Sequence, residues 1–402
     1  MASLARQLLV LMTRVVVFSG CFFGIWSSWL LARADFLYQQ DTEDSLRAAI
    51  RLVPDGWRYY MRLAQFDQSH ALELLNQALR RNRYNSQAYI ELGLRYEANG
   101  DNIAAEKSLL EAFAIDDTYL PRWSLANFYL RRDNQPAFWT WAKRAVEMPA
   151  DEIGPLFELC WRVTPDPQTI TTAIFNEKPE FLRQYVQFLM KKNQFSAVTA
   201  VTPYLVRTGN AETDRGLLLS AINYLVSVNE ASAANSLWRQ LVDHRWVIAD
   251  AGTPNNAFFA RVPLPVSFDW TLWEYTGLHS WPGASGLEVE FNGQEPEECA
   301  IAEQTVILSP ANYTLTYSYS TTDIPANTGI QWQVVDAKSG AVLAISPSLS
   351  SDTPKQSVLA FSVLQPASQL RLRLIYKRFL GTPRISGTLV VTSTNIRFTT
   401  SS

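Results

Sequence analysis

Residues 86–119 read SQAYIELGLRYEANGDNIAAEKSLLEAFAIDDTY, and these 34 residues decide the fold of the chain. Apolar, aromatic and small side chains recur in them at helical spacing, in two runs, at Tyr89, Leu92, Gly93 and Tyr96 and then at Ala105, Leu109 and Ala112. Gly100 stands between the two runs, where a turn is expected. Gly93 and Ala105 are small enough to let two helices cross closely. The stretch therefore predicts a helix–turn–helix pair.

The same pattern recurs on both sides of this stretch. Upstream it falls on Tyr60, Leu63, Ala64, Ala71, Leu75 and Ala78, and directly downstream on Trp123, Leu125, Ala126, Tyr129, Trp141 and Ala145. Weaker matches follow at Phe181, Tyr185, Phe188, Ala197 and Val201, and then at Leu217, Ala221, Tyr224, Ala233 and Leu237. Residues 149–179 are irregular, because several prolines break helices there. The sequence predicts an all-α solenoid over residues 41–248, with five or six helix pairs and a degenerate middle pair.

The unit of residues 86–119 resembles the tetratricopeptide repeat. The resemblance implies a scaffold whose first helices line a groove for protein or peptide partners. Carried across residue by residue, the groove positions are Ile90, Leu94, Asn127 and Arg131, with Leu182 and Val186 in a later repeat. The basic clamp with which some members grip a C-terminal carboxylate is not evident. Arg131 and Arg132 would meet an acidic partner or form a solvated helix end.

A sharp change of composition at residues 249–256 indicates a linker to a second kind of structure. The helical period disappears beyond it, and apolar and polar residues alternate over residues 257–399. About eight strands with joints rich in proline, glycine and asparagine predict an all-β antiparallel sandwich. The order of segments, with GLEVEFNG at 286–293, VILSPANYTLTY at 306–317 and LRLRLIYKR at 370–378, resembles a jelly roll of the carbohydrate-binding-module type, also called galactose-binding-like.

Aromatic residues at the start of the β region are candidates for stacking on sugar rings. Parity along an expected opening strand puts Phe268 and Trp270 on the core face and turns Trp273 and Tyr275 the other way. Trp281 follows in an expected loop rich in glycine and proline. Outward-facing aromatic rings would suit polysaccharide binding. The alternative is that these rings pack against the solenoid or between loops.

The N-terminal segment is the third part of the chain. Residues 15–32, VVVFSGCFFGIWSSWLLA, carry no charge and are just long enough to cross a bilayer as a helix. Arginines precede the segment and acidic residues follow it, which favours an N-terminus inside. We expect residues 1–34 to be a transmembrane anchor in the inner (cytoplasmic) membrane, with the bulk of the chain periplasmic or extracytoplasmic. The small residues Ala32 and Ala34 leave a cleaved signal peptide open as the alternative.

The remaining composition limits the chemistry of the chain. The net charge is −3, and no basic footprint for nucleic acid is present. The three cysteines and three histidines are scattered, so neither a metal site nor a cofactor is indicated. The HExxH and GxSxG motifs and phosphate-cradling glycine-rich loops are absent from the sequence, so no catalytic residue is assigned.

These features together predict a multidomain, non-enzymatic, membrane-anchored scaffold of the cell envelope. The order of domains resembles that of bacterial repeat proteins associated with the production and export of surface polysaccharide, an analogy at the level of the fold. The alternative is a glycan-binding protein in which the C-terminal sandwich binds the sugar.

Overall fold

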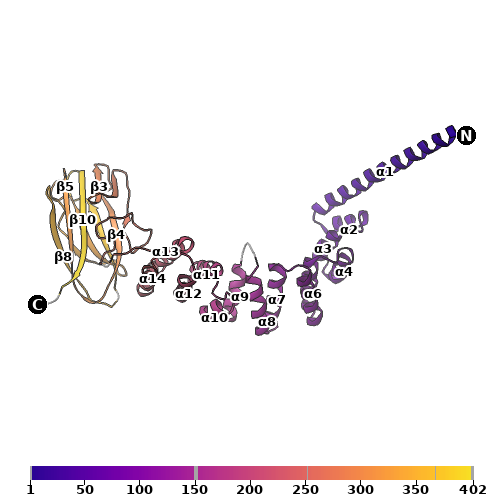
Figure 1. Cartoon of the computed structure of the whole chain (residues 1–402), viewed down its shortest axis with the longest axis horizontal. Coiled ribbons are helices and arrows are strands. Elements are labelled where there is room, and N and C mark those ends of the chain that lie inside the picture. The colour runs from indigo at the N-terminus through magenta and orange to yellow at the C-terminus, as the bar shows by residue number, and fades with distance from the viewer. Residues whose placement is uncertain (1, 149–152, 251, 367, 400–402) are drawn as a thin grey trace. The chain divides into compact units, whose positions relative to one another are not determined.

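The computed structural model describes residues 2–148, 153–250, 252–366 and 368–399. A series of helix pairs is followed by two antiparallel sheets that form a β-sandwich (Figure 1). This is the fold class that the sequence predicts. The chain divides into two compact units, Met1–Pro165 and Asp166–Ser402.

The first unit is helical throughout its described residues. Its elements are α1 (Ala2–Gln39), α2 (Glu43–Leu52), α3 (Trp57–Phe66), the short 3-10 helix η1 (Gln68–His70), α4 (Ala71–Arg81), α5 (Ser86–Ala98), α6 (Asn102–Ile115), α7 (Tyr119–Arg131), α8 (Gln135–Val146) and α9 (Gly154–Val163). The predicted pair is α5 and α6. Each begins at a side-chain cap, because Asn85 accepts a hydrogen bond from the Ala88 N–H at 3.1 Å and Asp101 accepts one from the Ala104 N–H at 3.0 Å.

The two helices of this pair cross closely at Gly93. A Cβ at that position would lie 2.8 Å from the Leu109 side chain and 3.2 Å from the carbonyl oxygen of Ala105. Both Leu109 and Ala105 are fully buried. A side chain larger than hydrogen therefore has no room at Gly93, which confirms that the small residues serve a close helix crossing.

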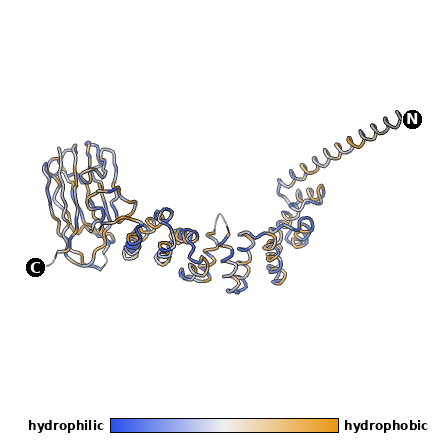
Figure 2. The backbone as a smooth tube through the Cα atoms, viewed as in Figure 1, coloured by the Kyte–Doolittle hydropathy of each residue, from blue (hydrophilic) through white to orange (hydrophobic). Residues whose placement is uncertain are grey.

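The C-terminal end of α1 belongs to the helical repeats. Ala34 is fully buried in a small apolar cluster with Ala49 of α2 and Tyr59 of α3. The Tyr59 hydroxyl donates a hydrogen bond to Asp35 at 2.8 Å. The stretch Arg14–Gln39 of α1 is long and apolar enough to cross a membrane, with a mean hydropathy of 1.8 in its most apolar window (Figure 2). A membrane anchor and a signal sequence both have this character.

The second unit begins with the helices α10 (Pro167–Ala173), α11 (Pro179–Lys191), α12 (Phe195–Thr208), α13 (Ala211–Ser227) and α14 (Ala231–Asp243). The predicted irregular stretch contains α10, which has only 7 residues. Pro155, Pro167 and Pro179 do not interrupt helices there, contrary to the expectation from sequence. Each lies in the first turn of its helix, where the missing N–H needs no partner.

The sandwich consists of two five-stranded antiparallel sheets, with the strand orders β1-β4-β9-β6-β7 and β2-β3-β10-β5-β8. Its strands are β1 (Thr271–Leu272), β2 (Leu278–Gly283), β3 (Gly286–Asn292), β4 (Glu298–Leu308), β5 (Ala311–Thr322), β6 (Ile330–Asp336), β7 (Val342–Ile345), β8 (Lys355–Val363), β9 (Ser368–Lys377) and β10 (Ser386–Phe398). Trp270 and Trp332 pack in the core with ring centroids 5.9 Å apart. Alternate residues of β3 and β5 fill the space between the sheets, as the period of two predicts.

Two details of the predicted β region are wrong. The expected opening strand does not extend over residues 268–272, because only Thr271 and Leu272 form a strand. The Asp269 carboxylate accepts hydrogen bonds from the Leu264 and Trp270 N–H groups, which folds the preceding residues into a turn. The expected loop around Trp281 is instead strand β2.

Residues 252–257 and the last helix pair both pack on the sandwich. The Gln304 side chain pairs with the backbone of Asn255 through two hydrogen bonds of 2.8 and 2.9 Å. The Asn223 side chain of α13 accepts hydrogen bonds from Ser267 at 2.8 Å. Trp238 of α14 lies against Phe268, with ring centroids 6.0 Å apart. The end of the helical repeats thus shares apolar and polar contacts with the sandwich in this unit.

Candidate binding surfaces

The predicted groove residues differ widely in exposure. Leu94 is 40% exposed, whereas Ile90 is buried and Leu182 and Val186 are fully buried in the helical core. The placement of Ile90, Leu182 and Val186 on a binding surface is therefore wrong. In these three cases the helix turns the side chain toward its neighbours, which the spacing of repeat positions does not reveal.

The two polar groove residues are held by bonds within the first unit. The Asn127 amide donates to the carbonyl oxygen of Trp123, one turn earlier, at 3.0 Å. The Arg131 guanidinium binds both oxygens of the Glu97 carboxylate, at 2.8 and 2.6 Å. This bidentate pair joins α5 to α7 at the same level of two successive repeats. Leu94 and Arg131 are the exposed residues of the predicted surface, and Arg131 is paired with the mostly buried Glu97.

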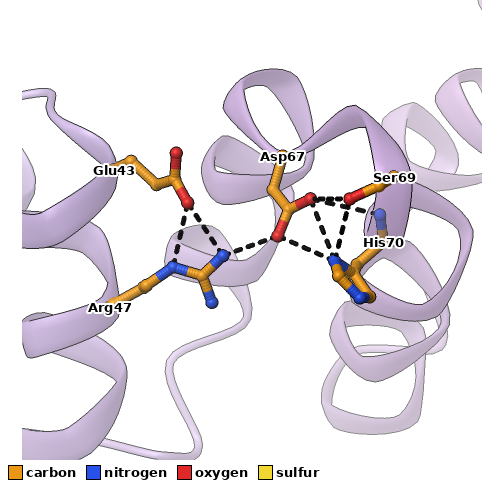
Figure 3. A network of polar contacts seen from close by, with 5 residues as sticks. All are labelled: Glu43, Arg47, Asp67, Ser69 and His70. Carbon is orange, nitrogen blue, oxygen red and sulfur yellow. Dashed lines mark hydrogen bonds and ion pairs between the residues drawn. The ribbon is translucent and has the colours of Figure 1, made fainter.

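A second polar network joins the first repeats around Asp67, at the end of α3 (Figure 3). The Arg47 guanidinium reaches Asp67 at 2.6 Å from α2 and also binds Glu43. Ser69 donates to the same carboxylate at 2.7 Å, and the His70 N–H donates to it at 3.2 Å. The bonds from Ser69 and His70, together with the Arg47 charge, hold the pKa of Asp67 well below its usual range.

The Asp67, Ser69 and His70 side chains do not form a catalytic relay. Both Ser69 and Asp67 lie 3.0 Å from the same ring nitrogen of His70, Nδ1. A relay requires the acid and the nucleophile to use opposite nitrogens of the imidazole. Within the described ranges, no group of three or more His, Cys, Asp or Glu side chains is placed to hold a metal ion.

A polar row crosses one sheet of the sandwich on its outer face. The register places five residues side by side on the successive strands β1, β4, β9, β6 and β7, namely Thr271, Glu303, Arg373, Gln333 and Ile345. Arg373 Nε lies 2.9 Å from Glu303 Oε2, and both side chains remain partly exposed. An ion pair beside an amide, on a flat sheet, offers donors and acceptors for a polar ligand.

Unmatched polar atoms occur along the same face. Arg371 Nε and Gln369 Oε1 are buried without a hydrogen-bond partner in the part of the chain that the structure describes. The Gln369 amide donates instead to the carbonyl oxygen of Val226, at the end of α13, at 3.3 Å. The last helix pair therefore covers one end of the face. The row through Glu303 and Arg373, at the other end of the face, stays uncovered.

The three aromatic candidates do not form one platform. Trp273 is 43% exposed and follows Thr271 by two residues, so alternation places it on the face of the polar row. Trp281 is 38% exposed but lies on the edge strand of the other sheet, where it faces Glu288 in the register. Tyr275 packs against the sandwich core. Of the three, Trp273 alone adjoins the polar row.

Arg371 and Arg373 were missed by the sequence reasoning, although a signal for them exists. Residues 370–374 read LRLRL, and strict alternation assigns the leucines to the core and the arginines to the outer face. Their partners Glu303 and Gln333 come from distant strands, and only the pairing register of the folded sheet brings them together.

Comparisons with known proteins give similar solved structures for both kinds of element. No protein-family model matches the chain, and no curated protein matches its sequence. The chain is similar to TTC0263, a TPR protein of Thermus thermophilus, with 22% identity, a TM-score of 0.28, and coverage of 30% of this chain and 71% of that one. It is similar to YrrB, described as a TPR protein with an unusual peptide-binding site, with 13% identity, a TM-score of 0.25, and coverage of 51% and 94%.

A third similar structure, described as "CBM4 structure and function", has 13% identity and a TM-score of 0.24, and the match covers 32% of this chain and 94% of that one. All three TM-scores are below 0.5. The class of the chain, tetratricopeptide-like helix pairs followed by a β-sandwich, therefore rests on its own repeat, helix boundaries and sheet order.

Replacement of Asp67 tests the polar network. Because the folded pKa lies below the unfolded one, the charged carboxylate stabilises the fold above about pH 4, and this contribution is lost as pH falls toward the folded pKa. We expect Asp67→Asn to lower the helical melting temperature, followed by circular dichroism, by a few degrees at about pH 6. The deficit relative to the wild type should shrink at about pH 3. Asp55→Asn, at an exposed turn, is the matched control. A deficit independent of pH would contradict this assignment.

Proposed function

We propose that this protein is a non-enzymatic, membrane-anchored scaffold whose helical repeats bind protein or peptide partners in the cell envelope. The observation that carries the proposal is the repeated helix pair, in which α5 leaves Leu94 exposed beside the Glu97–Arg131 pair. An exposed apolar side chain provides contact area for an extended peptide, and the oriented ion pair next to it provides charged groups that fix the position of the peptide.

We divide the chain accordingly into an anchor at residues 1–34, a helical part at 41–248, a linker at 249–256 and a sandwich at 257–399. The last helix, α14, ends at Asp243, and the first strand begins at Thr271, which supports a change of structure between them. Asn255 and Asn256 are buried, so we regard the linker as a packed connection and not a flexible tether.

We favour a retained anchor over a cleaved signal. Cleavage after Ala34 would cut a continuous helix at a fully buried residue and would remove the turn that packs against Ala49 and Tyr59. The arginines before the apolar stretch support an N-terminus inside and a periplasmic body. A role in the production or export of polysaccharide is the part of the proposal that rests on the order of domains alone.

Glycan binding by the sandwich is the second candidate function. The polar row through Glu303, Arg373 and Gln333 favours it, because Trp273 lies on the same face at the edge of the sheet. An aromatic ring beside paired charged groups and amides can stack on a sugar ring and bind its hydroxyl groups.

Site-specific cross-linking tests the scaffold. A photoreactive amino acid in place of Leu94 should give discrete protein adducts in cell envelopes, detected by mass spectrometry. The same probe at Lys107, an exposed position on α6, should not. Arg131→Glu should reduce the adducts at position 94 by about fivefold, the effect of losing ~1 kcal/mol at an interface. Equal yields from positions 94 and 107 would contradict the proposed surface.

Extraction at alkaline pH tests the anchor. The full chain should stay in the membrane pellet, and its N-terminal peptide should include residues before Ala34 when read by mass spectrometry. A variant with Phe18, Phe22 and Phe23 changed to serine should leave the membrane while keeping the helical signal, because these side chains are more than 70% exposed. A mature chain that begins at Asp35 would show that the segment is a cleaved signal.

Two tryptophan variants test the sandwich. Trp270→Ala should cost ~3–5 kcal/mol of stability, since the ring is 1% exposed and stacks near Phe259 and Trp332. Trp273→Ala should change stability by less than ~0.5 kcal/mol. If the outer face binds glycan, Trp273→Ala should weaken affinity by about fivefold, as for loss of one aromatic contact worth ~1 kcal/mol. Thermal melting and calorimetric titration with polysaccharide would measure both, and unfolding of Trp273→Ala would refute its role as a surface platform.

A further inference from the structure

A cavity of about 260 Å³ lies in the second unit at the open edge of β4. Strand β1 is only two residues long and covers β4 at residues 302 and 303. Residues 304–307 continue past it and form one wall of the cavity. Helix α14, Phe268 and the connection, through Ala249, Asp250, Gly252, Thr253 and Asn255, provide the other walls. The cavity is therefore built where the last repeat, the connection and the sandwich meet.

One wall of the cavity is apolar. Trp238 and Phe268 line it and are 8% and 6% exposed, with ring centroids 6.0 Å apart. Val242 and Val306 add aliphatic surface from α14 and β4. Such a wall suits the carbon skeleton of a small ligand.

One buried hydrogen-bond donor of the lining has no partner within the described residues. Asn255 is 8% exposed, and its Oδ1 accepts a bond from the Asp250 N–H at 2.9 Å, while its Nδ2 has none within the described residues. The Thr305 N–H donates to the carbonyl oxygen of Ser267 across the open edge at 2.7 Å. Strand alternation directs the Ile307 N–H to the same edge. A buried unpaired donor is costly, so a ligand with acceptor oxygens would be favoured here.

The rim supplies charged groups of both signs. Arg239 and Asp243 lie one turn apart on α14, and Asp250 completes the rim, where it lies 3.3 Å from Arg261. Arg239 makes no ion pair in the described part of the chain. Arg261 neutralises Asp250, which leaves Arg239 and Asp243 as one charge of each sign, so the rim has no net charge. Groups that both donate and accept, such as hydroxyls, match this set of side chains.

We propose that this cavity binds one neutral sugar residue, with the ring against the Trp238–Phe268 wall and its hydroxyl groups bonded to Asn255, Arg239 and Asp243. The volume lies just below the ~300–1,000 Å³ of pockets for drug-sized ligands, which suits a single hexose ring. This site contacts both α14 and β4, so a bound sugar stabilises the junction of the repeats with the sandwich. The inference does not depend on the partner surface at Leu94 or on the outer sheet face.

The test uses the full chain in a detergent without a sugar headgroup. Methyl glycosides of glucose, galactose and mannose are titrated by calorimetry and by ligand-observed saturation-transfer NMR. At least one should bind and raise the melting temperature. Arg239→Met and Asn255→Asp should each weaken it by about tenfold, the effect expected for a hydrogen bond to a polar ligand. Asn255→Asp keeps the acceptor for the Asp250 N–H, removes the free donor and adds a negative charge.

Arg215→Met, an exposed arginine on α13 outside the cavity, is the matched control and should leave affinity unchanged. Absence of binding by all three glycosides overturns the proposal. So does binding that survives both cavity variants. Binding that is lost in Trp273→Ala but kept in Arg239→Met would place the sugar on the outer sheet face, refuting this site and supporting the second candidate function. If Asn255→Asp fails to fold, Arg239→Met decides alone, because its side chain is exposed.

Discussion

The close crossing of two helices at a residue without a side chain is the constraint on which the helical part of this protein depends. At Gly93 the backbone of α5 comes so near α6 that an added Cβ would lie 2.8 Å from Leu109. Because the two helices approach so closely, Ala105, Leu109 and Ala112 are fully buried. A single helix pair is nevertheless too small to enclose a core by itself. The exposed flank of each pair must then be covered by the next, which makes stacking obligatory.

Stacked repeats leave an apolar surface on the first and on the last helix pair. In this chain a different structural element packs against each of these two surfaces. In the first unit the C-terminal turn of α1 supplies Ala34 to the apolar cluster and Asp35 to the hydroxyl of Tyr59. In the second unit, α13 and α14 pack on the sandwich through Asn223 and Trp238. Neither of these elements, the last turn of α1 or the sandwich, is an ordinary polar capping helix. Each joins the repeats to a part with another role, a candidate anchor in one case and a candidate ligand-binding domain in the other.

The sequence was most informative where the helical spacing of apolar residues determines both the secondary structure and which side chains are buried. The pair at residues 86–119 could be predicted closely, because its caps, turn glycine and small crossing residues all lie within one short stretch. Prediction failed where tertiary contacts decide. Ile90 occupies a nominal groove position and is buried by neighbouring helices, and Phe268 alternates correctly with Trp270 but belongs to a turn held by Asp269. The row through Glu303 and Arg373 requires pairing between strands far apart in the sequence, which no local pattern encodes.

The two candidate ligand sites of the sandwich, the outer sheet face and the cavity, differ in how costly their unpaired hydrogen-bond donors are. On the outer face, Arg371 is a long side chain whose remaining donors can reach solvent, so an unpaired Nε there costs little. Asn255 has a short side chain fixed at both ends, by Gln304 through its backbone and by Asp250 through Oδ1. It cannot turn its amide toward water without breaking those bonds. A donor held in this way remains costly until another molecule accepts from it, and this makes the cavity the more selective of the two places for a sugar hydroxyl.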